Sequence, residues 1–236
     1  MVNTYFGLTS YTKYMSKDYK RIHLIAEPHV PSFEGKTKTI ATLIKNKIKN
    51  EKFKGKIFLE LNSEKQKNNQ KFKQTLTSFP AFYKNIANNI NNTKIEFFDS
   101  RESFIKKQIK SNNSPASPFV YTFLIGEIPL KCLIIDPLKF LKELEKQAKK
   151  SKFGMDYIRV NMIHVLTYAN EINDFINHYE SKNKGNKNKP ISQFKGNINH
   201  MSYLIDKFRT IITFIADVNL LRLIEKSFNA NIRNVY

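Results

Sequence analysis

Acidic residues follow three short apolar runs in the first hundred residues of this chain. Glu27 and His29 come after the first run, Glu60 closes the second, and Asp99 and Arg101 come at the end of the third. Carboxylates with an imidazole can hold a divalent metal and lower the pKa of its bound water. Alternatively, His29 can act as a general base on water, oriented by Glu27 or Glu60. Arg101 would then clamp a substrate carboxylate or phosphate, or stabilise an oxyanion.

These five residues are the predicted catalytic residues. Glu27, His29 and Glu60 are the predicted ligands if a divalent metal serves as cofactor. Asp99 has a second interpretation, because with Glu102 three residues later it has the spacing of a helix-capping pair.

The elements that must position these residues are strands and helices in alternation. The stretches 21–29, 56–60 and 94–101 each contain a short run rich in β-branched or aromatic side chains that ends on an acid, which predicts a strand in each. Residues 36–50 and 63–92, between them, have apolar side chains at helical spacing. Strand–helix–strand crossovers predict parallel strands, so the acidic ends should share one edge of one sheet.

We therefore predict an α/β fold with a central, largely parallel sheet flanked by helices and a mainly helical C-terminal half. The chain is expected to be a single domain, 1–236, with a sheet-forming half at 1–135 and a helical half at 136–230. A segment rich in Lys, Asn and Gly at 181–197 is expected to be a mobile linker. Residues 1–20 fit either a strand or a short helix.

The C-terminal half carries its own helix signals. Asp136 followed by Pro137 predicts a helix start, with aspartate as the cap and proline at the first position. Residues 156–180 and 198–228 have long apolar stripes at helical spacing, and residues 231–236 resemble the opening of a strand.

Asp217 lies in an apolar turn of the last predicted helix. Burying a lone carboxylate is costly, so Asp217 should be a structural residue that pairs with an arginine such as Arg101 or with a backbone donor. His164 and His178 lie on an amphipathic helix and are expected to be structural.

The 236 residues carry a formal net charge of +20, from 40 Lys and Arg against 20 Asp and Glu. The lysines are spread along the chain and occur with asparagines, a pattern that an A/T-rich coding sequence produces. Nucleic acid is therefore a possible partner but not the favoured one. Cys132 is the only cysteine, which excludes an intrachain disulfide. No signal peptide or membrane-spanning stretch is apparent, so an intracellular location is expected.

The strand-end residues resemble a known superfamily. Ile25-Ala26-Glu27-Pro28-His29 is similar to the Gly-Glu-x-His motif of the erythromycin esterases, the ChaN-like haem-binding proteins and the Tiki/TraB proteins. Phe58-Leu59-Glu60 and Asp99-Ser100-Arg101 resemble the second and third elements of that pattern. Uncharacterised proteins of large DNA viruses are more similar still, and share a helix like 216–222. Ala26 stands where the family has glycine, and no counterpart of the family's later histidine occurs up to Tyr236.

Three functions fit these observations. The first is a hydrolase-like protein acting on a small-molecule or peptide substrate, with water activated directly or through a metal. The second, which the resemblance implies, is a non-catalytic viral or host-interaction protein that keeps the fold and binds a ligand; its location would be the host cytoplasm. The third is a polyanion-binding protein that uses its lysine-rich surface.

Overall fold

The structure is a computed structural model of the whole chain. It describes residues 5–6, 10–18, 20–26, 38–39, 55–62, 95–109, 129–182, 188 and 198–235. The chain divides into two compact units. The first unit contains Met1–Phe98 and Lys226–Tyr236, and the second unit contains Asp99–Glu225.

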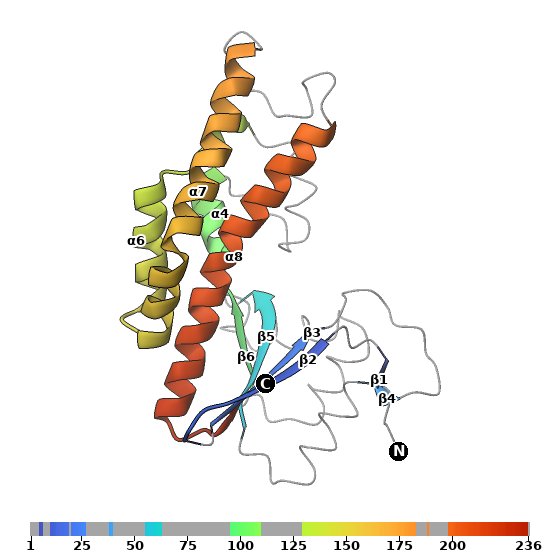
Figure 1. The fold of residues 1–236 in the computed structure, drawn as a ribbon, viewed down its shortest axis with the longest axis vertical. Coiled ribbons are helices and arrows are strands. Elements are labelled where there is room, and N and C mark those ends of the chain that lie inside the picture. The colour runs from blue at the N-terminus through green and yellow to red at the C-terminus, as the bar shows by residue number, and fades with distance from the viewer. Residues whose placement is uncertain are drawn as a thin grey trace. The chain divides into compact units, whose positions relative to one another are not determined.

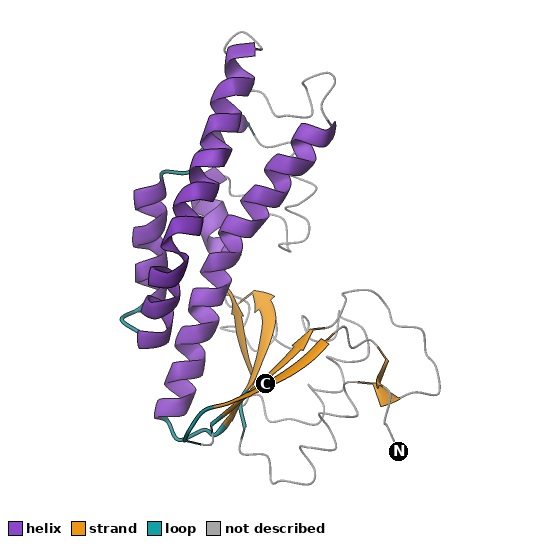
Figure 2. Cartoon of the chain, viewed as in Figure 1, coloured by secondary structure: helices purple, strands orange, loops and turns teal. Residues whose placement is uncertain are grey.

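Helices account for most of the described residues (Figure 2). The strands are β1 (Tyr5–Phe6), β2 (Ser10–Met15), β3 (Arg21–Ala26), β4 (Lys38–Thr39), β5 (Ile57–Asn62), β6 (Ile95–Asp99) and β7 (Asn234–Val235). The helices are α4 (Arg101–Ile109), the 3-10 turn η4 (Leu130–Cys132), α6 (Pro137–Ala148), α7 (Lys152–Lys182) and α8 (Ile198–Asn229), labelled in Figure 1 except for η4.

The first unit contains three small sheets. β2 and β3 form an antiparallel hairpin, and β7 pairs in parallel with the other edge of β3. β5 pairs with β6, and β1 pairs in parallel with β4. The hairpin turn is closed by the Ser16 N–H, which donates to the Lys20 carbonyl at 2.9 Å, and by the Lys20 N–H, which donates to Ser16 Oγ at 3.1 Å.

The predicted large central parallel sheet is wrong. The described strands form sheets of only two or three strands, and β3 does not pair with β5 or β6. The physical reason is that both edges of β3 are occupied by segments near the two ends of the chain, and not by the strands of the predicted crossovers. One edge pairs with β2, from the undecided N-terminal region, and the other pairs with β7 near the end of the chain. Lys38–Thr39 is also a strand, although it falls inside the expected helix at 36–50.

The strand expected at 231–236 is confirmed as β7. After α8 the chain reverses at Asn231, whose positive φ of 59° is a conformation that asparagine tolerates better than most residues. The Arg21 N–H donates to the Arg233 carbonyl at 2.7 Å, and the Lys56 N–H donates to the Asn234 carbonyl at 3.0 Å. The C-terminal strand thus connects backbone from two distant parts of the first unit.

The second unit is helical, and its helices begin where capping residues occur. Asp136 accepts hydrogen bonds from the Leu138 and Lys139 N–H groups at the start of α6, as the sequence predicts. Ser151 caps α7 by accepting from the Gly154 N–H at 3.1 Å.

Glu225 of α8 reinforces the start of α7. Its carboxylate accepts a hydrogen bond from Ser151 Oγ and one from the Phe153 N–H at 3.0 Å. Burial by itself raises the pKa of the Glu225 carboxyl, but these hydrogen bonds, together with the Lys152 N–H and the Lys152 charge, lower the pKa below the ordinary value. The contact fixes the register between α7 and α8 at this end.

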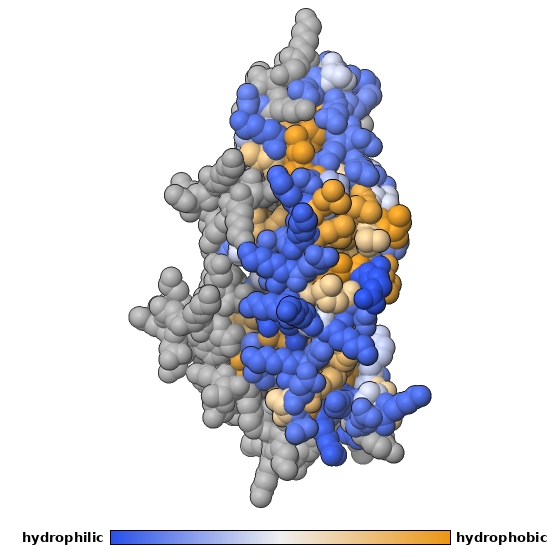
Figure 3. Space-filling model, turned by 90° about the vertical axis from the view of Figure 1, so that its left-hand side faces the viewer, coloured by the Kyte–Doolittle hydropathy of each residue, from blue (hydrophilic) through white to orange (hydrophobic). Residues whose placement is uncertain are grey.

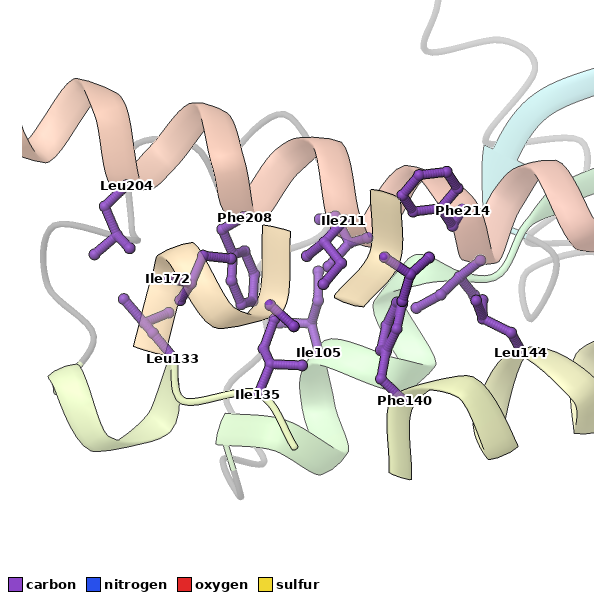
Figure 4. Packing of buried hydrophobic residues seen from close by; sticks show 14 of the residues in the cluster. Ile105, Leu133, Ile135, Phe140, Leu144, Ile172, Leu204, Phe208, Ile211 and Phe214 are labelled. Atoms are coloured by element: carbon purple, nitrogen blue, oxygen red, sulfur yellow. The ribbon is translucent and has the colours of Figure 1, made fainter. Parts of the chain in front are cut away.

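The core of the second unit lies where α4, α6, α7 and α8 face one another, as Figure 4 shows for part of the cluster. Buried positions on α7 recur at helical spacing and form one face: Gly154, Ile158, Val165, Ala169, Ile172, Ile176 and Tyr179. Phe208 of α8 is almost completely buried within this cluster. Phe140 of α6 packs edge-on against Phe104 of α4, with ring centroids 5.2 Å apart.

A side-chain amide joins the extended segment before α6 to α7. Asn173 Nδ2 donates to the Ile135 carbonyl at 2.7 Å, and Asn173 Oδ1 accepts from the Ile135 N–H at 2.9 Å. The amide therefore pairs with this backbone as a neighbouring strand would, and satisfies both polar groups of a buried residue. Residues 63–92 and most of 181–197 lie outside the described residues.

Candidate functional site

The best-defined predicted site residues lie where β6 ends and α4 begins. The Asp99 side chain, only 2% exposed, accepts three hydrogen bonds from Arg101. Its Oδ1 accepts from the Arg101 backbone N–H at 3.0 Å and from Nε at 2.9 Å, and its Oδ2 accepts from Nη2 at 2.9 Å. A two-point contact between carboxylate and guanidinium fixes the plane of the arginine as well as its charge.

This geometry defines the role of Asp99. Both of its oxygens accept hydrogen bonds from Arg101, so the carboxylate orients the guanidinium and anchors the first residue of α4. The sequence left capping and site membership as alternatives for Asp99. The contact with the Arg101 N–H is of the capping type, and the side-chain contacts make Asp99 a positioning residue for Arg101.

Ser100 lies between these two residues in the Asp-Ser-Arg motif, and the sequence does not predict it as a site residue. It is 8% exposed, and its Oγ has no hydrogen-bond partner within the described parts of the chain. A buried hydroxyl without a partner costs free energy, and a water molecule, an ion or a ligand can supply the missing partner. The only sequence signal for Ser100 is its place between Asp99 and Arg101, at the end of a strand.

The structure gives less information on the other predicted site residues, Glu27, His29 and Glu60. Glu60 lies on β5 and its side chain is exposed. Glu27 and His29 lie outside the described residues, so the structure brings together only Asp99 and Arg101 of the five. Within the ranges that the structure describes, no three His, Cys, Asp or Glu side chains could hold a metal ion. The metal site predicted for Glu27, His29 and Glu60 stays a prediction.

Asp217 accepts a hydrogen bond from a tyrosine, which is neither the arginine nor the backbone donor expected from the sequence. The Tyr157 hydroxyl on α7 donates to Asp217 Oδ2 on α8 at 2.5 Å. The Tyr157 ring also lies against Phe214, with centroids 6.0 Å apart. Burial, followed by the hydrogen bond to Asp217 and its negative charge, raises the pKa of the Tyr157 hydroxyl far above its ordinary value.

This pair predicts a loss of stability at alkaline pH. The pKa of Tyr157 is higher in the folded chain than the unfolded value of 10.0, so its contribution to stability is complete below pH 10 and decreases as the pH rises above it. Tyr157→Phe leaves Asp217 without this donor and is expected to cost about 1–2 kcal/mol at neutral pH. The difference in unfolding free energy between wild type and this variant should shrink above pH 10. Urea unfolding at several pH values measures it, and a difference that grew with pH would contradict the assignment.

A lysine between two tyrosines connects the same helices further along. Lys207 Nζ of α8 lies 2.6 Å from Glu171 Oε2 of α7, and 4.8 Å and 5.3 Å from the ring centroids of Tyr168 and Tyr203. The hydrogen bond with Glu171 raises the pKa of Lys207, against a smaller effect of burial. The Lys207 ammonium therefore stabilises the contact between α7 and α8 through Glu171 and the two tyrosine rings.

Comparison with protein-family models, with curated proteins and with solved structures finds no match for this chain. No helix within the described ranges combines the length and the apolar character needed to cross a membrane.

Proposed function

We propose that this chain is a hydrolase-like protein that holds its substrate at the junction of β6 and α4. The observation that supports this most strongly is that a fixed guanidinium and a buried hydroxyl belong to adjacent residues, and that the hydroxyl has no hydrogen-bond partner in the described structure. Arg101, whose side chain is 15% exposed, supplies the positive charge, and Ser100 supplies the hydroxyl. Together they suit a substrate oxygen that carries or gains negative charge, as in a carboxylic or phosphoric ester.

The water-activating residues in this proposal are those predicted from the sequence. His29, oriented by Glu27 or Glu60, removes a proton from water, and the water oxygen attacks the carbonyl carbon or the phosphorus. Arg101 and Ser100 Oγ stabilise the oxygen on which negative charge develops. The proton taken by His29 is then transferred to the leaving-group oxygen as its bond breaks. Glu27, His29 and Glu60 would alternatively hold a divalent metal, whose chemistry would be to supply a water of lowered pKa.

The test is hydrolysis of p-nitrophenyl acetate and p-nitrophenyl phosphate by the full chain. Wild type should release p-nitrophenol faster than buffer does, and His29→Ala should lower kcat by about 10²–10⁴-fold, the usual contribution of a general base. His178→Ala, which changes an exposed histidine on α7, is the matched control and should leave kcat unchanged. Equal turnover by wild type and His29→Ala would refute the mechanism. Absence of turnover in folded wild type would favour the non-catalytic binding alternative.

Ser100→Ala separates a substrate-contacting role from a structural one. Because Ser100 Oγ has no partner within the described chain, its removal should leave the unfolding free energy unchanged or slightly increased. The KM should nevertheless rise. A clear loss of stability with unchanged KM would show that the hydroxyl serves the fold.

A further inference from the structure

Helix α7 carries apolar side chains on the face opposite its buried one. Val160 is 75% exposed and Ile163 is 64% exposed, and Phe153, two turns before Val160, is 38% exposed. These residues fall on one stripe with Asp156 and Thr167, at alternating spacings of three and four residues: 153, 156, 160, 163, 167 and 170. Figure 3 views the molecule from the side on which Figure 1 draws α6 and shows apolar side chains gathered there among polar ones. We call residues 153–170 at this spacing the outer stripe.

Exposed apolar side chains at coiled-coil spacing are typical of a helix that packs against another helix. Val160 and Ile163 are β-branched residues that are mostly exposed, so they add little to the core of their own unit. Their burial by a partner would remove apolar surface from water at about 25 cal/mol per Å².

The charge around the stripe indicates what kind of partner fits. Residues 136–182, which include α6 and α7, contain eight Lys and Arg and seven Asp and Glu, a net charge of +1, whereas the whole chain carries +20. Nearly all of the excess positive charge therefore lies elsewhere in the chain. A nucleic acid or an anionic membrane would be attracted to those other regions and not to this nearly neutral one.

The stripe is complementary to itself. When two copies of α7 lie antiparallel about a point midway between Val160 and Ile163, Val160 of each copy faces Ile163 of the other. Asp156 then faces Thr167, whose hydroxyl can donate to it, and Phe153 faces Asn170. No like charges face each other along the stripe, and every contact occurs twice, as a two-fold contact requires.

We infer that the outer stripe of α7 binds the outer stripe of a second copy of this chain in an antiparallel, two-fold contact. The remaining positive charge of each copy opposes the association at long range. Added salt screens that repulsion, since the Debye length is about 10 Å at 0.1 M, but leaves the apolar contact in place. Association should therefore strengthen with salt, whereas binding of an acidic partner or a polyanion weakens with salt.

Sedimentation equilibrium of the full chain, between about 10 µM and about 1 mM, measures the association. The average mass should rise from 27.7 kDa towards twice that value as concentration increases, and more so at about 0.5 M than at about 0.1 M salt. Ile163→Lys should remain at 27.7 kDa at every concentration. Met15→Lys, which changes an exposed apolar residue on β2, is the matched control and should associate like wild type. A mass of 27.7 kDa for wild type throughout, or association that weakens with salt, would overturn the inference.

A mixing experiment tests the antiparallel register. Val160→Glu and Ile163→Lys should each remain monomeric, because each would bury unpaired charges against an apolar partner. Mixed together they should form a heterodimer, in which the new carboxylate of one copy faces the new ammonium of the other. A mixture that stays monomeric while wild type dimerises would rule out this register. Circular dichroism should show the same helix content in all variants, since both positions are exposed.

Discussion

Arg101→Met is expected to destabilise the second unit by about 3–5 kcal/mol, the cost of removing one partner of a buried ion pair. Asp99 is 2% exposed and accepts both side-chain hydrogen bonds from Arg101. Methionine fills a similar volume but leaves the carboxylate buried without its counter-charge. The loss of stability arises mainly because water cannot reach the buried Asp99 carboxylate to replace its lost counter-charge. If water could reach this carboxylate, the loss would be small.

Urea unfolding followed by circular dichroism measures this loss. Arg209→Met is the matched control, because Arg209 and Asp206 form an exposed pair 4.0 Å apart that should contribute less than about 0.5 kcal/mol. A second variant, Asp99→Asn with Arg101→Met, should recover part of the loss because no charge is then buried. If Arg101→Met alone were as stable as wild type, solvent would have to reach Asp99, and the pair would not fix Arg101.

Phe208→Ala is expected to destabilise the second unit by about 3–5 kcal/mol. Phe208 is 1% exposed and lies in the cluster between α4, α6, α7 and α8. Removing the ring loses its transfer free energy and leaves a cavity, because side chains held by four helices can close it only in part. Phe208→Leu should cost less, since leucine fills more of the space.

The midpoint of urea unfolding measures both variants, and Arg209→Ala serves as a control one residue along the same helix. Arg209 is exposed, so its replacement should change stability by no more than about 0.5 kcal/mol. If Phe208→Ala and Arg209→Ala were equally stable, the packing of α8 against this cluster would be wrong.

Sequence periodicity was sufficient to predict the helices of the second unit. The expected helices at 156–180 and 198–228 correspond to α7 and α8, and Asp136 caps α6 as predicted. These features depend on interactions within a few residues, namely the 3.6-residue apolar repeat and the cap contact, so the local sequence contains them. The same applies to the junction at Asp99 and Arg101, two residues apart in the sequence.

The sequence alone also determined that β3, β5 and β6 are strands, although β5 continues to Asn62, beyond the predicted end at Glu60. Only the tertiary structure decided which strands pair. β3 pairs with β2 and β7, and β7 lies more than 200 residues along the chain, so no local pattern encodes its pairing. Tertiary structure also decided that Tyr157 donates a hydrogen bond to Asp217, and that the hydroxyl of Ser100 has no partner in the described chain. The reason is the same in each case: backbone pairing and burial depend on segments distant in sequence, whereas helix periodicity and capping do not.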